Sequence, residues 1–101
     1  MAVETQYDVA KAMLTIKVVG RFDFAVHQEF RKAIEKIVST TKVIVIDFYV
    51  TDYMDSSALG MLLVLRDKVS ATQQTVQLIN MKPEVRKILE IAHFDKLFTV
   101  I

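Results

Sequence analysis

The sequence predicts an α/β fold: a single domain with a mixed β-sheet, parallel β-α-β crossovers and helices packed against the sheet. Apolar residues first alternate with a period of two and then recur at helical spacing, and strand-like and helix-like segments follow one another along the chain. Residues 43–46 read "VIVI" with no polar alternation, which is typical of a parallel strand covered on both faces. The length of 101 residues, with 2 Gly and 1 Pro, indicates one ordered domain over residues 1–101.

The chain should begin with two strands at residues 3–9 and 13–19, joined by a hairpin connection at 10–12. In the second strand the alternation puts one set of apolar side chains (Leu14, Ile16, Val18) opposite a mixed set (Met13, Thr15, Lys17, Val19). Gly20 then interrupts the strand pattern.

A first helix should follow Asp23, whose carboxylate can accept hydrogen bonds from the free amides of the first turn. Apolar residues recur at helical spacing after it, and polar residues occupy the other side. The apolar set is Val26, Phe30, Ala33, Ile34, Ile37 and Val38. The polar segment at 39–42 should end this helix.

The second half of the chain repeats the strand-helix order. After the strand at 43–46, a helix should run from Ser56 to about residue 72, and a strand should occupy 75–80. Pro83 should open the last helix, because its missing N–H costs nothing at the first helical position. Residues 94–101 should close the chain as a short edge strand.

Composition narrows the classes of partner. The 13 basic and 12 acidic residues are scattered, and no basic stripe suggests a nucleic-acid partner. The longest apolar run, Met61–Leu65, is far shorter than the roughly 20 residues that span a bilayer, so no direct membrane insertion is expected. The first residues do not resemble a signal peptide, and the chain has no cysteine. We therefore expect a cytoplasmic protein.

The segment "DYMDSSALGMLLVLRD" (52–67) places two serines at the start of the most apolar predicted helix. One serine could simply cap that helix, which is a common role. A hydrolase nucleophile would need glycines where Met54 and Ala58 stand, and His27 and His93 have no accompanying triad motif. We therefore expect no enzyme activity, no catalytic residues, no metal and no cofactor.

A resemblance to a known family favours a third role for the serines. The segment "YMDSSALGMLL" (53–63) is similar to the phosphorylation segment of STAS domains in anti-sigma factor antagonists. The segments "GRFDFAVHQEFRKAI" (20–34), "VIVIDF" (43–48) and "INMKPEVRKILEIAHFDKLF" (79–98) resemble other parts of that family in the same order. The chain departs from the family pattern at Ala58, where glycine is usual, and at Arg21, where an acid is frequent.

The resemblance implies a switch controlled by phosphorylation of Ser56. The unphosphorylated domain would bind a serine-kinase-type anti-sigma factor or related regulator, phosphorylation would release it, and a PP2C-type serine phosphatase would reset it. The switch would thereby control transcription, with stress, motility or biofilm genes as candidate outputs. The expected partner-binding residues are Asp23, Phe24, Tyr53, Met54, Asp55, Ser57, Ala58, Leu59 and Met61.

Several of these residues have a purely structural alternative. Asp23 could be a helix cap and Asp55 a turn residue, and Met61 is better suited to the core than Met54. The alternative function is that of a STAS accessory subunit in a membrane transport complex, where phosphorylation would be incidental.

Overall fold

A computed structural model describes residues 2–101, and its main sheet has five strands. The strand order is β1 (Val3–Asp8), β2 (Met13–Val18), β4 (Val43–Asp47), β6 (Thr75–Ile79) and β7 (Thr99–Val100). β1 is antiparallel to β2, and all other neighbours in this sheet are parallel. This is the predicted mixed sheet, including its short closing edge strand.

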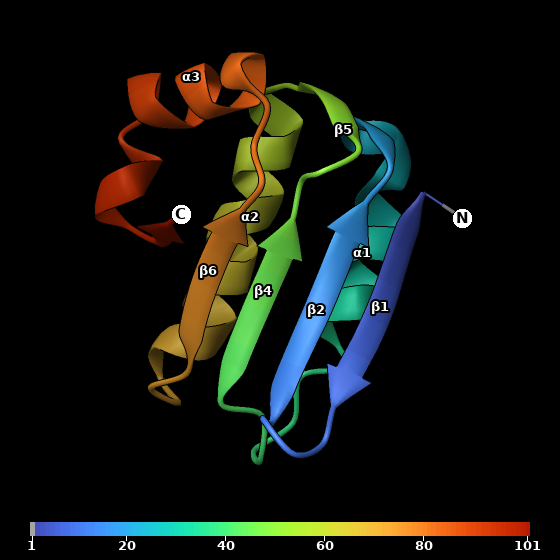
Figure 1. The fold of residues 1–101 in the computed structure, drawn as a ribbon, viewed down its shortest axis with the longest axis vertical. Coiled ribbons are helices and arrows are strands. Elements are labelled where there is room, and N and C mark those ends of the chain that lie inside the picture. The colour runs from blue at the N-terminus through green and yellow to red at the C-terminus, as the bar shows by residue number, and fades with distance from the viewer. Residues whose placement is uncertain (1) are drawn as a thin grey trace.

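Three helices accompany the sheet: α1 (His27–Ile34), α2 (Ser56–Ser70) and α3 (Pro83–Ile91). Short 3-10 turns at Phe24–Val26 and Phe94–Lys96 precede α1 and follow α3. α1 and α2 lie behind the sheet in Figure 1, while α3 lies across the upper end of the molecule. Among residues 2–101, no helix combines the length and apolar character needed to cross a membrane.

The core lies between the main sheet and the two helices behind it. The alternation placed Leu14, Ile16 and Val18 on one face, and all three are buried. Leu14 and Ile16 stand beside buried residues of β4 in the strand register. Three buried aromatic rings extend this core, with Phe22 5.1 Å from Phe30 and 6.1 Å from Phe48 between ring centroids.

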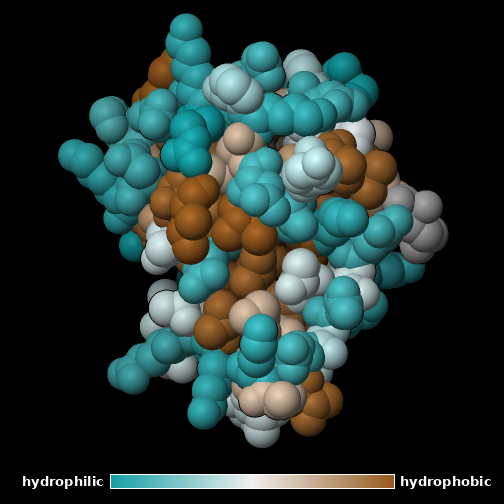
Figure 2. Space-filling model, viewed as in Figure 1, coloured by the Kyte–Doolittle hydropathy of each residue, from teal (hydrophilic) through white to brown (hydrophobic). Residues whose placement is uncertain are grey.

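The prediction that residues 43–46 are covered on both faces needs correction. In the described part of the chain, residues 2–101, no helix lies over the front face of the sheet (Figure 1), where apolar side chains interrupt a polar surface (Figure 2). Val45 is nevertheless only 5% exposed, because β4 is central and Val45 is flanked in register by Thr15 and Gln77. The β-branched run therefore reflects a central strand rather than a doubly covered one.

A second, two-stranded parallel sheet was not predicted. It pairs β3 (Gly20–Phe22) with β5 (Thr51–Met54). Gly20 has a φ of +83°, a left-handed conformation that side chains disfavour, and its amide donates to the Val50 carbonyl at 2.9 Å. The buried Thr51 hydroxyl donates to the Val18 carbonyl at 2.8 Å, which ties β5 to the end of β2.

The first helix is shorter than its apolar pattern suggested. α1 ends at Ile34, and turn-type hydrogen bonds carry the chain onward from Glu35. Ile37 remains buried in this turn, whereas Val38 is 53% exposed and does not belong to the core stripe. A turn after a helix end can still place one apolar residue against the core. The apolar pattern in the sequence therefore continues beyond the last residue of the helix.

Candidate functional site

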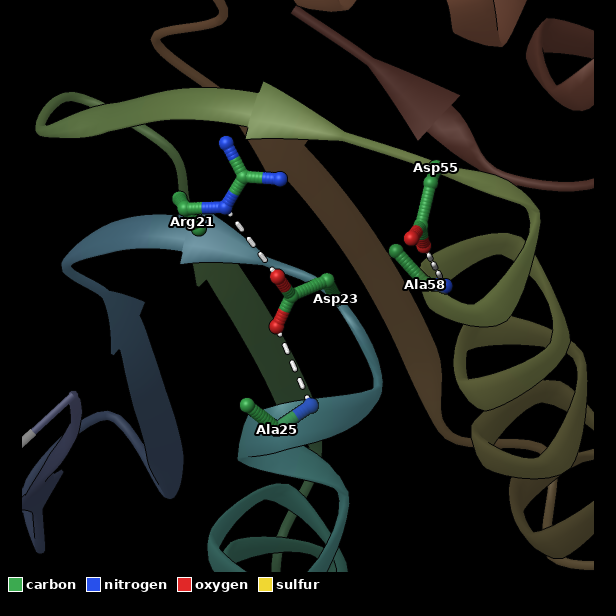
Figure 3. Close-up of polar contacts among 5 residues, drawn as sticks. All are labelled: Arg21, Asp23, Ala25, Asp55 and Ala58. Atoms are coloured by element: carbon green, nitrogen blue, oxygen red, sulfur yellow. Dashed lines mark hydrogen bonds and ion pairs between the residues drawn. The ribbon is translucent and has the colours of Figure 1, made fainter.

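The small sheet brings two turns of the chain together. Phe22 of β3 stands beside Met54 of β5, so Asp23 and Asp55 directly follow the ends of two paired parallel strands. Figure 3 shows both aspartates where a strand leads into a helix. From the sequence alone, residues 20–24 are expected beside the serine segment, because the loops that follow strands gather at one edge of an α/β sheet. The structure provides the direct cause, which is the β3–β5 pair.

Asp55 caps α2. Its backbone is extended, and its Oδ1 accepts from the Ala58 amide at 3.2 Å. An N-terminal cap of this kind satisfies one of the amides that have no partner within the helix. The helix is therefore capped by the aspartate, and neither serine has this task.

Ser56 is the first residue of α2 and is exposed, whereas Ser57 is half-buried. Within residues 2–101, neither serine hydroxyl makes a hydrogen bond that would occupy it. The Ser56 side chain is therefore accessible from solvent at the amino end of a 15-residue helix, where the helix dipole favours negative charge.

Asp23 makes two different contacts. Its Oδ1 accepts from the Ala25 amide at 3.0 Å and caps the 3-10 turn, while its Oδ2 accepts from Arg21 Nε at 3.1 Å. The guanidinium carbon of Arg21 lies 3.9 Å from the centre of the Tyr53 ring, which adds a cation–π contact. Sequence reasoning noted Arg21 only as a departure from the family, because the contact with Tyr53 depends on the unpredicted β3–β5 register.

The expected partner-binding residues fall into exposed and buried groups. Phe24 is 69% exposed and stacks on His27 with 5.2 Å between ring centroids. Tyr53 is also exposed, and Leu59 is half-buried. The expectation that Met54, Ala58 and Met61 bind the partner needs correction, because these residues are buried in the core at 2%, 0% and 6% exposure.

The charged side chains of the site come from the two turns. Within residues 2–101, no group of three or more His, Cys, Asp and Glu side chains is arranged to hold an ion. The charged groups at the two turns are the carboxylates of Asp23 and Asp55 and the guanidinium of Arg21 (Figure 3). What the site offers chemically is the accessible Ser56 hydroxyl beside the exposed aromatic side chains of Phe24 and Tyr53.

The chain belongs to the STAS domain family, whose family model matches residues 1–101. The STAS-domain containing protein PA14_20770 of Pseudomonas aeruginosa (strain UCBPP-PA14) is 49% identical over 87 residues, which are 86% of this chain and 86% of that protein.

Solved structures share the fold. The anti-sigma factor antagonist SpoIIAA in its unphosphorylated form is 22% identical, with a TM-score of 0.68 over 95% of this chain and 97% of that chain. The phosphorylated form of the Bacillus cell fate determinant SpoIIAA is 20% identical, with a TM-score of 0.69 over 99% and 91%. A sulfate transporter family protein from Wolinella succinogenes is 15% identical, with a TM-score of 0.78 over 94% and 79%.

Proposed function

We propose that this STAS domain is an anti-sigma factor antagonist that works as a phosphorylation-controlled partner switch in the cytoplasm. With Ser56 unphosphorylated, it binds a serine-kinase-type anti-sigma factor or related regulator, and phosphorylation releases it. The observation that carries this proposal is the exposed Ser56 hydroxyl at the start of α2, left available because Asp55 does the capping.

The chemistry of the cycle needs nothing from the chain beyond that hydroxyl. The kinase transfers the terminal phosphoryl group of ATP to Ser56 Oγ, and ADP and the hydroxyl proton leave. A PP2C-type serine phosphatase then uses water to cleave the phosphoester, which restores the serine and releases inorganic phosphate. Neither step requires a cofactor held by this domain.

The physical effect of the phosphate falls on the surface rather than on the fold. A phosphoserine adds a charge of about −1.5 to −2, which the amino end of α2 tolerates. A partner packed against Phe24 and Tyr53 would have to remove water from this new anion at the edge of its contact, which is unfavourable. The similarity of this fold to both forms of SpoIIAA supports a domain that keeps its structure through the cycle.

The test uses the purified chain with its kinase-type partner. We expect tandem mass spectrometry after kinase treatment to find phosphate on Ser56 alone, and Ser56→Ala to abolish incorporation while Ser57→Ala retains it. Ser56→Asp should remain folded by thermal denaturation and lose affinity in isothermal titration. Phosphate on Ser57, or full affinity of folded Ser56→Asp, would refute the switch.

The alternative is an accessory role in a membrane transport complex. The sulfate transporter family neighbour supports it only at the level of the fold. In that role binding to a transporter subunit would be the same for Ser56→Ala and Ser56→Asp, so the titration above separates the two functions.

A further inference from the structure

A groove with a volume of about 400 Å³ runs between α1 and α2. Its floor is apolar, formed by the buried side chains of Phe30, Ile34 and Met61. One wall is Val64, which is 60% exposed although it is fully apolar. The groove is therefore an open trough, and its apolar wall faces solvent.

The rim of this groove carries more positive than negative charge. Arg31 and Lys68 lie on the rim with a single carboxylate, that of Glu35. Within residues 2–101, neither Arg31 nor Lys68 takes part in an ion pair or a side-chain hydrogen bond. Two cations therefore stand beside an exposed apolar wall, and the Glu35 carboxylate forms an ion pair with neither of them.

Two elements of the chain lead from the groove toward Ser56. His27, the first residue of α1, lines the groove and stacks on the exposed Phe24, which directly follows Asp23. α2 connects the two places directly, since it begins at Ser56 and contributes Met61, Val64 and Lys68 to the groove. A partner that covers Phe24 therefore reaches the groove without a gap in the contact.

We propose that this groove receives an amphipathic helix of the regulator, with its apolar face over the groove floor and against the exposed Val64, and with acidic residues beside Arg31 and Lys68. The inference rests on the proposed function, because the regulator is the partner assigned there. α1 has 8 residues, about 12 Å at 1.5 Å per residue, so the groove has room for about two turns of a helix. Helices with one apolar face bind shallow apolar grooves in this way.

The openness of the groove favours a helix over a small apolar molecule. Sites for small ligands bury about 70–90% of the ligand surface. A trough with exposed walls covers one side of its occupant, which suits a helix that is apolar on one side only. The charged rim adds selectivity, because complementary charges steer association and exclude like-charged partners.

Matched charge reversals test the proposal by isothermal titration against the purified kinase-type regulator. Arg31→Glu and Lys68→Glu should each weaken binding about tenfold or more. Lys32→Glu on α1 and Arg66→Glu on α2 change the net charge equally at exposed positions outside the groove, and should change affinity less than about threefold. Equal losses from all four variants, or none from Arg31→Glu and Lys68→Glu, would overturn the groove as the docking site.

A cross-linking experiment identifies the occupant. The chain has no cysteine, so Val64→Cys can be labelled uniquely with benzophenone maleimide. We expect cross-links to an acidic amphipathic helix of the regulator, and far fewer from Lys17→Cys on the front face of the sheet. Cross-links to a basic or extended segment overturn the proposal. Two other outcomes also overturn the proposal if the groove variants keep their affinity for the regulator. The first is binding of dodecanoate, which would make a small apolar molecule the occupant. The second is self-association that Arg31→Glu abolishes, which would make a second copy of the chain the occupant.

Ser56→Asp measured beside the groove variants separates this inference from the switch. Loss of binding in Ser56→Asp with unchanged binding in the groove variants would leave the switch standing and refute the groove. Loss in the groove variants with full binding of Ser56→Asp would support the groove as a docking site and refute the switch.

Discussion

Asp55 and Ser56 have separate roles: Asp55 caps α2, and Ser56 is the proposed phosphorylation site. A single serine could have had both roles. The aspartate accepts the Ala58 amide and fixes the start of α2, so the next side chain can be altered without removing the cap. The sequence predicted the start of this helix. The assignment of Ser56 as the phosphorylation site came from the family resemblance and stays a prediction. It did not predict which residue caps, because aspartate and serine are about equally good at that position.

The cap role of Asp55 leads to a stability prediction. Asp55→Ala should lower the free energy of unfolding by about 1 kcal/mol, the typical cost of losing a side-chain cap. Asp55→Asn should retain most of it, because the amide oxygen can accept the same bond. Urea denaturation is the measurement, with Asp67→Ala as the control at an exposed position inside α2. Equal stability of Asp55→Ala and the wild type would show that the bond contributes nothing.

At the scale of elements, the long helices and strands were predictable and the shortest strands were not. β1, β2, β4 and β6 each carry five or six residues of strand pattern, and α2 and α3 begin at the predicted residues Ser56 and Pro83. β3 has three residues and β5 has four, too few for alternation to show. Their pairing depends on partners about thirty residues apart in the chain, which local periodicity does not report.

The hydrogen bond from Thr51 to the Val18 carbonyl should be important for the β3–β5 pair. Thr51→Val keeps the shape of this fully buried side chain but removes the donor, so a carbonyl loses a buried partner. We expect a loss of about 1–2 kcal/mol in the free energy of unfolding. Thr99→Val, at an exposed position of β7, is the matched control and should be nearly neutral. A neutral Thr51→Val would mean that other contacts hold β5 in place.

At the scale of the whole molecule, the sequence predicted the mixed sheet and the neighbourhood of the two turns, but not which residues reach the surface. Met54 and Met61 are apolar like Phe24, but their side chains are buried, whereas that of Phe24 is exposed. Met54 points into the core from a short strand whose register was unknown. Exposure of this kind depends on how separate elements pack against one another.

The surface position of Phe24 leads to a prediction about partner binding. Phe24→Ala should weaken binding of the regulator at least about tenfold, which corresponds to 1.4 kcal/mol, because exposed aromatic residues often anchor interfaces. Stability should change little, since the ring is 69% exposed. Ile91→Ala is a matched control, because Ile91 on α3 is apolar and also 69% exposed. Isothermal titration with equal losses from both variants would place the interface elsewhere.

The separation of β3 and β5 from the main sheet has a consequence for local unfolding of the domain. Among residues 2–101, no strand ladder joins the two sheets, so we expect the small pair to open while the main sheet stays closed. Amide hydrogens of Arg21, Phe22 and Tyr53 should then exchange with deuterated water faster than those of Ile44–Ile46. Phosphorylation or partner binding should slow the first group selectively. Uniform exchange across both sheets would mean instead that the β3–β5 pair, which precedes Ser56, opens only when the whole domain unfolds.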